Sequence, residues 1–139
     1  MNHCRFCQIA KGERDAFTVA KSDHVLAFLD VNPIIEGHTL VIPVEHHTGI
    51  DTLPEETVRE LFATASKLTH ALEEVLQPDG FSLFHTTGPI IGNIDHAHIH
   101  LVPRYSEDDI KISLPRDELD YETGEHLQAD ITDELASIE

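Results

Sequence analysis

Residues 95–104, Asp95-His96-Ala97-His98-Ile99-His100-Leu101-Val102-Pro103-Arg104, are the most informative stretch of this chain. Three histidines alternate with apolar residues, and this period of two predicts a β-strand with an imidazole face and an apolar face. At a rise of about 3.3 Å per residue, the first and third histidines would lie roughly 13 Å apart. Zinc binds nitrogen at about 2.0–2.1 Å, so one ion cannot bind all three, and we expect the histidines to have different roles. The alternative, an edge strand with three solvated histidines, fits so dense a cluster poorly.

The length and the hydropathy pattern indicate a single globular domain. A chain of 139 residues is within the usual size of one domain. No apolar run approaches the roughly 20 residues of a membrane span. The first residues, Met1-Asn2-His3-Cys4, lack the basic region and apolar stretch of a secretory signal. We therefore expect a cytoplasmic protein.

The formal net charge of −17 comes from nine basic and 26 acidic residues. This balance argues against nucleic-acid polymers and anionic membranes as partners, because phosphate binding needs a cationic surface. Residues 106–139 alone carry 12 acidic and two basic residues. The acidic surface and the presence of only four lysines favour a halophilic protein, in which concentrated salt screens the repulsion. The alternative is a mesophilic protein with an acidic tail.

One long helix is predicted after Thr52, which forms a capping box with Glu55 and is followed by Pro54 in the first turn. Apolar residues then recur at intervals of three and four, which predicts one face packed on a sheet. This face comprises Val58, Leu61, Phe62, Ala65, Leu68, Leu72, Val75 and Leu76.

The remaining pattern predicts about five short strands joined by turns. Strands are expected at residues 17–20, 25–29, 39–42, 81–85 and 95–104, and shorter helices at 6–11 and about 124–136. The connections are too short for repeated βαβ crossovers, so the prediction is an α+β fold with an antiparallel sheet and one long helix on it. We expect residues 1–105 to form the domain and residues 106–139 to be an acidic C-terminal extension of the same domain.

Cys4 and Cys7 form a Cys-x-x-Cys motif near the N-terminus. The spacing is compatible with half of a metal site, a redox pair or two unrelated thiols. A structural zinc site would need two further ligands, because such sites are closed tetrahedra. Alternatively, the two cysteines are small buried apolar residues.

These motifs together resemble the histidine-triad family, whose signature is His-x-His-x-His followed by apolar residues. The resemblance extends through Cys4-Arg5-Phe6-Cys7, Phe28-Leu29-Asp30-Val31-Asn32-Pro33 and Gly37-His38-Thr39-Leu40-Val41-Ile42-Pro43. It covers roughly residues 3 to 105 in the family's order, so it is specific. The resemblance implies nucleotidyl hydrolase or transferase chemistry and a HIT-like fold.

For the metal, the resemblance implies a structural zinc ion bound by four side chains. The implied ligands are Cys4, Cys7, His46 and His96. His47 is the alternative to His46, because adjacent side chains diverge and only one can face the ion.

For the reaction, the resemblance implies that His98 is the nucleophile and that His100 contacts the reacting phosphate. Histidine can form a covalent intermediate that divides one difficult step into two easier ones. Its pKa near neutrality keeps much of the imidazole unprotonated. A hydrogen bond to the other ring nitrogen of His98 must fix its tautomer, and in the family a backbone carbonyl usually accepts it.

For the substrate, the resemblance assigns Asp30 to the ribose hydroxyls. The apolar positions around the base match Phe6, Ile9, Phe28 and Val31, although such residues are also typical of a core. Arg104 follows the family's frequent Pro-Arg pattern but could equally be a surface charge.

Two departures from the family pattern affect the leaving group. The family's Gly-Gln-(Ser/Thr) run is here Ile91-Gly92-Asn93, so the substrate-binding position 93 offers an amide in place of a hydroxyl. The family's Asn at the end of the preceding strand is replaced by Thr86 or His85. The preferred leaving group therefore stays open.

The resemblance therefore implies a homodimeric enzyme that hydrolyses a nucleotide at its α-phosphorus through a nucleotidyl-histidine intermediate. Candidate substrates are nucleoside phosphoramidates, acyl-nucleotides and dinucleoside polyphosphates. One alternative is a non-catalytic nucleotide sensor or partner protein. Another is a metalloenzyme in which His98 and His100 bind a catalytic ion.

Overall fold

The computed structural model describes residues 4–87 and 94–138 of the chain. The predicted substrate-binding residue Asn93 and its neighbours Ile91 and Gly92 lie outside the described residues. The chain divides into two compact units, Met1–Asp108 and Asp109–Glu139. That the second unit is an extension of the same domain stays a prediction.

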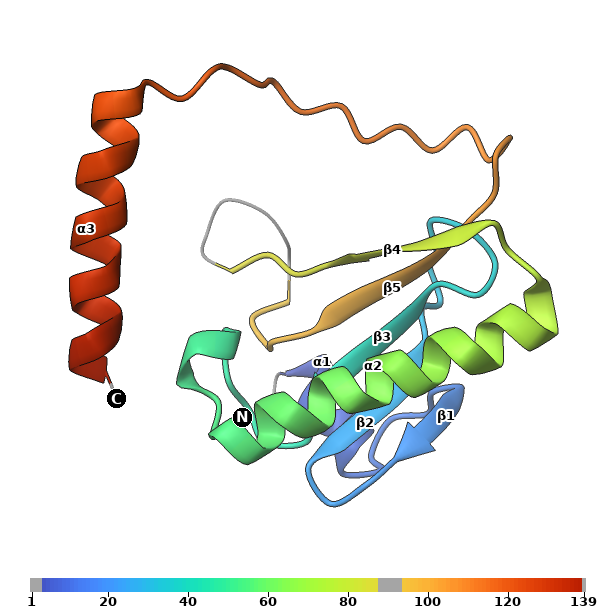
Figure 1. Cartoon of the computed structure of the whole chain (residues 1–139). Coiled ribbons are helices and arrows are strands. Elements are labelled where there is room, and N and C mark those ends of the chain that lie inside the picture. The colour runs from blue at the N-terminus through green and yellow to red at the C-terminus, as the bar shows by residue number, and fades with distance from the viewer. Residues whose placement is uncertain (1–3, 88–93, 139) are drawn as a thin grey trace. The chain divides into compact units, whose positions relative to one another are not determined.

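The first unit is built on a five-stranded antiparallel sheet (Figure 1). Its strands are β1 (Thr18–Lys21), β2 (Val25–Leu29), β3 (Thr39–Pro43), β4 (Gly80–Phe84) and β5 (Ile99–Arg104). They lie in the order β1-β2-β3-β5-β4, and every neighbouring pair is antiparallel. The predicted α+β class and the five-stranded antiparallel sheet are confirmed.

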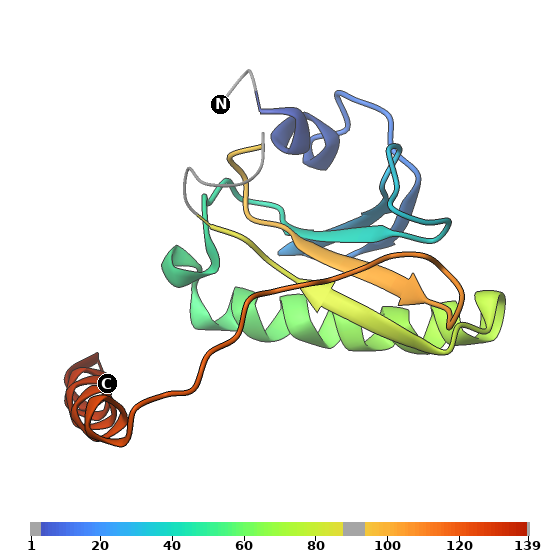
Figure 2. The same cartoon turned by 90° about the horizontal axis from the view of Figure 1, so that it is seen from above.

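Two helices cover opposite faces of this sheet, as Figure 2 shows. The six-residue helix α1 (Arg5–Ala10) lies on one face and the 22-residue helix α2 (Glu55–Leu76) on the other. The predicted cap of α2 is wrong: the N-cap residue is Pro54, and no side chain forms a capping bond. Thr52 instead belongs to the 3-10 helix η1 (Ile50–Thr52), where its hydroxyl donates to the Gly49 carbonyl at 3.4 Å.

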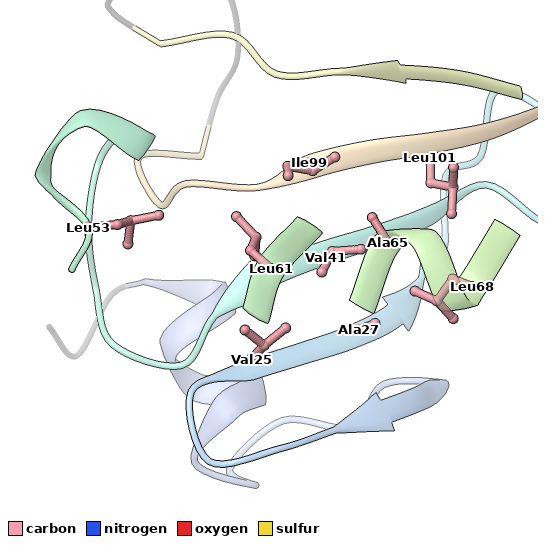
Figure 3. Close-up of a cluster of buried hydrophobic side chains, with 9 residues drawn as sticks. All are labelled: Val25, Ala27, Val41, Leu53, Leu61, Ala65, Leu68, Ile99 and Leu101. Carbon is pink, nitrogen blue, oxygen red and sulfur yellow. The ribbon is translucent and has the colours of Figure 1, made fainter. Parts of the chain in front are cut away.

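The main core lies between α2 and the sheet, and Figure 3 shows its side chains converging from both layers. Its buried members are Val25, Ala27, Val41, Leu53, Leu61, Ala65, Leu68, Ile99 and Leu101. The predicted helix face is too wide, because Phe62 is 43% exposed and Val75 77% exposed. The buried residues of α2 are Thr57, Leu61, Ala65 and Leu68, so only this central stripe is covered.

A second core cluster lies on the opposite face of the sheet, under α1. It contains Phe6, Leu26, Phe28, Leu40 and Ile42. Since side chains alternate along a strand, the residues of β2 and β3 divide between the two cores. The face that carries α1 is also the face toward which the triad histidines turn.

Strand β5 is shorter than predicted, because it begins at Ile99. His96 and His98 precede it in an irregular segment that is tied down by the Ala97 amide, which donates to the His47 carbonyl at 2.6 Å. The predicted alternation nevertheless holds, since Ala97 and Ile99 are each 1% exposed and belong to the apolar side.

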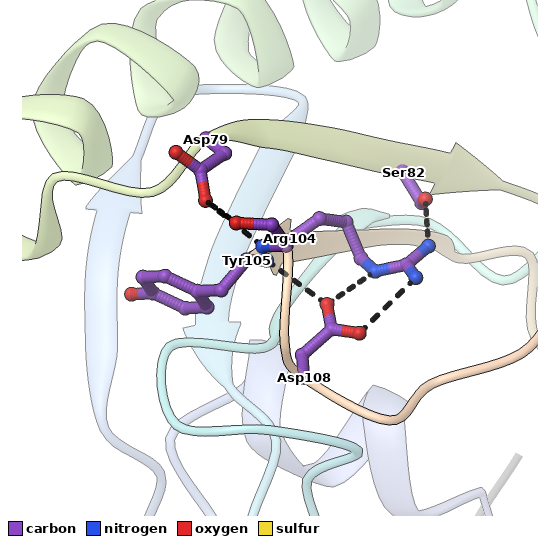
Figure 4. A network of polar contacts seen from close by, with 6 residues as sticks. Asp79, Ser82, Arg104, Tyr105 and Asp108 are labelled. Carbon is purple, nitrogen blue, oxygen red and sulfur yellow. Dashed lines mark hydrogen bonds and ion pairs between the residues drawn. The ribbon is translucent and has the colours of Figure 1, made fainter.

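Arg104 ends β5 in a network of polar contacts (Figure 4). Its guanidinium forms an ion pair with Asp108 at 2.8 Å and donates to the Ser82 hydroxyl at 3.0 Å. The Asp108 carboxylate also accepts from the Tyr105 amide at 2.9 Å. The pKa of Arg104 is raised, mainly by the hydrogen bond to Asp108. Arg104 therefore holds the chain where the first unit ends.

The second unit contains helix α3 (Tyr121–Ile138), preceded by a segment without regular secondary structure. The helix is longer than the predicted one, and none of its described residues is buried. No helix within the described residues combines the length and the apolar character that a membrane crossing requires.

Candidate active site and metal-binding cluster

Helix α1 brings two thiols and two imidazoles together. Cys4 is the N-cap residue of α1, and its sulfur accepts from the Cys7 amide at 3.3 Å, so both sulfurs turn to the same side. His96 Nδ1 lies 3.3 Å from the Cys4 Sγ and 3.5 Å from the Cys7 Sγ. His46 Nδ1 lies 3.2 Å from the Cys7 Sγ.

The four ligand atoms of Cys4, Cys7, His46 and His96 lie within 4.8 Å of one another, so this group could hold a metal ion. His96 is 1% exposed, and its Nε2–H donates to the Pro43 carbonyl at 2.9 Å. The Nδ1 lone pair consequently faces the sulfurs, which is the tautomer that a metal ligand needs.

His47 turns away from this cluster. Its Nδ1 lies 3.1 Å from the Thr52 hydroxyl, and its backbone carbonyl binds the Ala97 amide. The structure therefore brings His46, and not its neighbour, to the two cysteines.

A cavity of about 260 Å³ opens beside the cluster, on the α1 face of the sheet. It is lined by His98 and His100 together with the residues predicted to bind the nucleoside, namely Asp30, Phe6, Ile9, Phe28 and Val31. Phe6 and Phe28 are each 3% exposed, so they are part of the second core as well as of the cavity floor. Val31 lies at the rim, where it is 66% exposed.

His98 has one ring nitrogen bound and the other available. Its Nδ1 lies 2.7 Å from the His96 carbonyl oxygen, which can only accept, so Nδ1 carries the proton. In the neutral ring Nε2 then holds the lone pair. Burial lowers the pKa of His98 and outweighs this hydrogen bond, which raises the pKa. The ring is therefore kept neutral with Nε2 unprotonated.

A hydrogen bond from His38 fixes the tautomer of His100. The Ile34 amide donates to His38 Nδ1 at 3.0 Å, so His38 carries its proton on Nε2, 2.9 Å from His100 Nδ1. His100 thus accepts at Nδ1 and has its own proton on Nε2. Burial, with smaller contributions from the neighbouring histidines, lowers the pKa of His100 to about 4, so this ring is also neutral.

Sequence reasoning assigned no role to His38, although it lies in a motif that carries the resemblance. The available signal was its position two residues before Leu40, since in extended backbone leading into β3 both side chains share a face. Leu40 pairs with His100 in the sheet, which places His38 near the end of the triad. Gly37 before it has φ +96°, and a Cβ there would collide with Leu76 of α2, so only glycine permits this turn.

Asp30 lies at the mouth of the cavity with its side chain 20% exposed. One carboxylate oxygen accepts from the Asn32 amide at 2.9 Å, and the other lies 3.7 Å from His38 Nδ1. The Asp30 charge raises the pKa of His38, but burial has the larger effect and lowers it. One Asp30 oxygen therefore has only this long contact and remains available to a ligand.

Of the two alternatives for the family's Asn, the structure places His85 against the triad. The His85 Nδ1–H donates to the His98 carbonyl at 2.9 Å, and Nε2 lies 3.1 Å from the Thr87 hydroxyl. The preceding residue Phe84 stacks on the His100 ring, with centroids 4.4 Å apart and planes at 14°. The end of β4 thus supports the backbone and the rings of the triad.

Comparison with known proteins places this arrangement in one family. The family model of the HIT domain matches residues 11–107. An uncharacterized HIT-like protein of Methanocaldococcus jannaschii is 38% identical over 106 residues, which are 76% of this chain and 81% of that protein.

Two relatives have names that state an activity. An adenosine 5'-monophosphoramidase of Candida albicans is 28% identical over 142 residues, covering 98% of this chain and 93% of its own length. An adenylylsulfatase of Arabidopsis thaliana is 32% identical over 108 residues, covering 77% of this chain and 55% of its own length.

Solved structures agree in fold. A HIT family protein from Bacillus anthracis superposes with a TM-score of 0.89 at 32% identity, covering 96% of this chain and 97% of its own. A zinc-bound histidine triad family protein from Mycobacterium smegmatis superposes with a TM-score of 0.73 at 33% identity, covering 99% of each chain. The resemblance drawn from the motifs is thereby confirmed: this chain belongs to the HIT family, the histidine-triad proteins.

Proposed function

We propose that this protein hydrolyses a nucleotide at its α-phosphorus through a nucleotidyl-His98 intermediate. The observation that carries the proposal is the hydrogen bond from His98 Nδ1 to the His96 carbonyl at 2.7 Å, on a ring that lines the cavity. It leaves a neutral, half-buried imidazole with its Nε2 lone pair available for attack.

The reaction has two displacements at phosphorus. In the first, the His98 Nε2 lone pair forms a bond to the α-phosphorus while the bond to the leaving group breaks. The leaving group departs with that electron pair and takes up a proton. In the second, water adds to the phosphorus and loses a proton, the phosphorus–nitrogen bond breaks, and its electron pair returns to Nε2. The products are a nucleoside monophosphate and free His98.

His100 would stabilise the charge that develops on the phosphate oxygens. Its Nε2–H has no recorded partner among residues 4–87 and 94–138, and the ring lines the cavity. A hydrogen-bond donor fixed before the reaction requires no reorganisation when the charge appears. His38 acts as a positioning residue, because its bond to His100 Nδ1 keeps the His100 proton on Nε2.

Asp30 and the apolar residues would hold the nucleoside. A carboxylate can accept from both ribose hydroxyls, and one Asp30 oxygen has only the 3.7 Å contact with His38. Phe6, Ile9, Phe28 and Val31 offer the apolar surface for the base. The names of the two relatives support substrates in which an amine or a sulfate is attached to the phosphate of a nucleotide.

The Cys4, Cys7, His46 and His96 cluster fits a structural zinc ion. Ligands at Zn–S of about 2.3 Å and Zn–N of about 2.0–2.1 Å stand roughly 3.6 Å apart at tetrahedral angles. The nitrogen–sulfur distances of 3.2 to 3.5 Å are close to this value. Burial and the neighbouring Cys4 raise the pKa of Cys7, so without a cation its thiolate is disfavoured. Bound zinc would supply that charge and join α1 to the base of the triad segment.

This proposal is tested by mass spectrometry of the intact protein, quenched shortly after exposure to nucleoside phosphoramidates, acyl-nucleotides and dinucleoside polyphosphates. The expected result is an acid-labile adduct of one nucleotide on His98, together with release of nucleoside monophosphate. Binding without turnover of any substrate would support the nucleotide sensor instead. Activity that chelators abolish while the fold is retained would support the metalloenzyme. The homodimer and the cytoplasmic location are further proposals that rest on the family resemblance.

A further inference from the structure

The cavity wall carries charges that an apolar base pocket does not need. Arg5, Arg14 and Asp15 line it together with the apolar residues already described. The whole chain has nine basic residues against 26 acidic ones. Two of those nine therefore lie on one cavity of about 260 Å³. A role as solvated surface charges alone would not explain why two of so few basic residues lie on this cavity.

Arg14 is held in place by the loop that follows α1. The Gly12 amide donates to the Ile9 carbonyl at 3.1 Å, and Gly12 has φ +78°, so the chain turns sharply back toward the cavity. The Arg14 Nε–H donates to the Gln8 side chain at 3.1 Å. This bond orients the guanidinium, and no partner is recorded for its two terminal amino groups within residues 4–87 and 94–138.

Asp15 follows directly and offers the complementary charge. It is exposed, and across the described parts of the chain its carboxylate has no recorded hydrogen bond or ion pair. Both residues line the same cavity as Ile9, one of the apolar residues proposed to pack on the base. A base bound in that cavity would have a guanidinium and a carboxylate within the same wall to meet its polar edge.

Guanine matches this pair of groups and adenine does not. Guanine offers the acceptors O6 and N7, to which arginine binds in a bidentate manner. Beside them lie the N1–H and N2–H donors, which a carboxylate accepts with both oxygens. Adenine has an amino donor where guanine has O6 and a lone pair at N1. It would therefore face the guanidinium with a donor and the carboxylate with an acceptor.

We propose that Arg14 and Asp15 read the edge of the base and make guanine nucleotides the preferred substrates of this site. The inference rests on the proposed function for the placement of the nucleoside. It adds the specificity that the apolar residues cannot supply, since apolar contact alone does not separate two purines of similar size.

The first test compares kcat/KM of the wild-type protein for the 5'-phosphoramidates of guanosine, inosine and adenosine. We expect guanosine to exceed adenosine by about tenfold or more, the usual range for a bidentate base contact. Inosine lacks the 2-amino group and should lie between them. Equal rates for guanosine and adenosine, or a preference for adenosine, would overturn the inference.

The second test uses variants of the two reading residues. Arg14→Met keeps a long apolar stem, and Asp15→Asn keeps the shape of the side chain. Each should lower the guanosine-to-adenosine ratio of kcat/KM by about tenfold. The matched controls Arg59→Met and Asp23→Asn remove the same charges from exposed sites outside the cavity and should leave the ratio unchanged. An equal loss with both bases in Arg14→Met would show general electrostatic attraction and overturn the inference.

Calorimetric binding of GMP and AMP separates this inference from the proposed function. GMP binding more tightly than AMP, with no turnover of any phosphoramidate, would support guanine recognition and refute the hydrolase. Turnover without a guanine preference would support the hydrolase and refute guanine recognition. If neither nucleotide binds, both proposals are wrong.

Discussion

At the scale of single residues, three histidines of one motif differ because the second ring nitrogen of each has a different partner. The partner is the Pro43 carbonyl for His96, the His96 carbonyl for His98 and the His38 ring for His100. A carbonyl can only accept, so it forces the proton onto the nitrogen that faces it. The same side chain thus presents a lone pair to the cysteines, a lone pair to the cavity and a proton to the cavity.

The role of His98 leads to the first prediction. His98→Asn retains a polar side chain but removes the nucleophilic nitrogen, so turnover should fall by at least roughly 10³-fold. Nucleotide binding should persist, because Asp30 and the apolar floor are unchanged. The measurements are steady-state kinetics and calorimetric binding.

His70→Asn is the matched control, because His70 is exposed on α2, away from the cavity. It should leave turnover unchanged. If His98→Asn turned over nucleotide at nearly the wild-type rate, the nucleotidyl-histidine mechanism would be wrong.

At the scale of elements, the stability of α1 depends on its contacts with the rest of the chain. A helix of six residues is far below the length at which helices are stable in water. Its apolar side packs on the sheet through Phe6, and its thiols meet His46 and His96. A metal ion in that cluster would connect three chain segments that no long helix or strand joins.

The second prediction concerns this metal. Purified protein should contain about one zinc ion per chain. Cys4→Ser should lower the melting temperature, because the free energy of metal binding is part of the free energy of folding. His46→Asn should also lose zinc, whereas His47→Asn should keep it, since His47 faces Thr52.

Metal content by atomic emission and melting by circular dichroism test these expectations. Metal-free protein that melts at the same temperature as the purified protein would contradict a structural role. Zinc retained by His46→Asn but lost by His47→Asn would show that His47, and not His46, binds the ion.

Helix α2 is joined to the β1–β2 turn by a pH-sensitive contact. His24 lies 2.9 Å from Glu60, which also accepts from the Ser22 hydroxyl. The hydrogen bond to Glu60 raises the pKa of His24 above 6.5. Bonds from Ser22 and then His24 lower the pKa of Glu60 below 4.5. The contribution of the pair is therefore largest between about pH 4.5 and 6.5, and it is lost outside this range in both directions.

The third prediction follows from these signs. Glu60→Gln should lower the melting temperature more at about pH 5.5, below the raised pKa of His24, than at about pH 8.5, where less of the His24 ring is charged. Glu74→Gln, an exposed position near the end of the same helix, is the control and should show no such difference. An equal loss for Glu60→Gln at both pH values would mean that only the neutral hydrogen bonds matter.

At the scale of the whole molecule, the excess of acid is the dominant feature. The net charge of −17 and the 12 acidic residues after position 105 produce self-repulsion. The Debye length falls from about 10 Å at 0.1 M salt to about 3 Å at 1 M. Salt should therefore affect stability strongly.

The fourth prediction is that the melting temperature rises with potassium chloride to well above about 1 M. Sucrose at equal osmolality is the control, because it is excluded from protein surfaces without screening charge. A melting temperature that does not change between low and molar potassium chloride would favour the mesophilic alternative.

What the sequence alone determined are features that repeat along the chain. The alternation of His96 to Leu101 predicted the two faces of the triad segment, and the three-four spacing predicted α2, because these periods are properties of the backbone. The Cys-x-x-Cys motif and the triad together predicted the metal cluster through the family resemblance. The cap at Thr52 was wrong because Thr52 lies in a 3-10 turn, and the strand start at residue 95 was wrong because the Ala97–His47 bond joins segments far apart in the sequence.

Only the tertiary structure decided which atoms face one another. The proton positions of the triad depend on partners 53 and 62 residues away, at Pro43 and His38, which the antiparallel register brings alongside. The Arg104–Asp108 pair and the charged wall formed by Arg14 and Asp15 are likewise invisible to periodicity. A hydrogen bond depends on the distance and direction between two atoms. The sequence records neither, and both are fixed only when the strands pair in register.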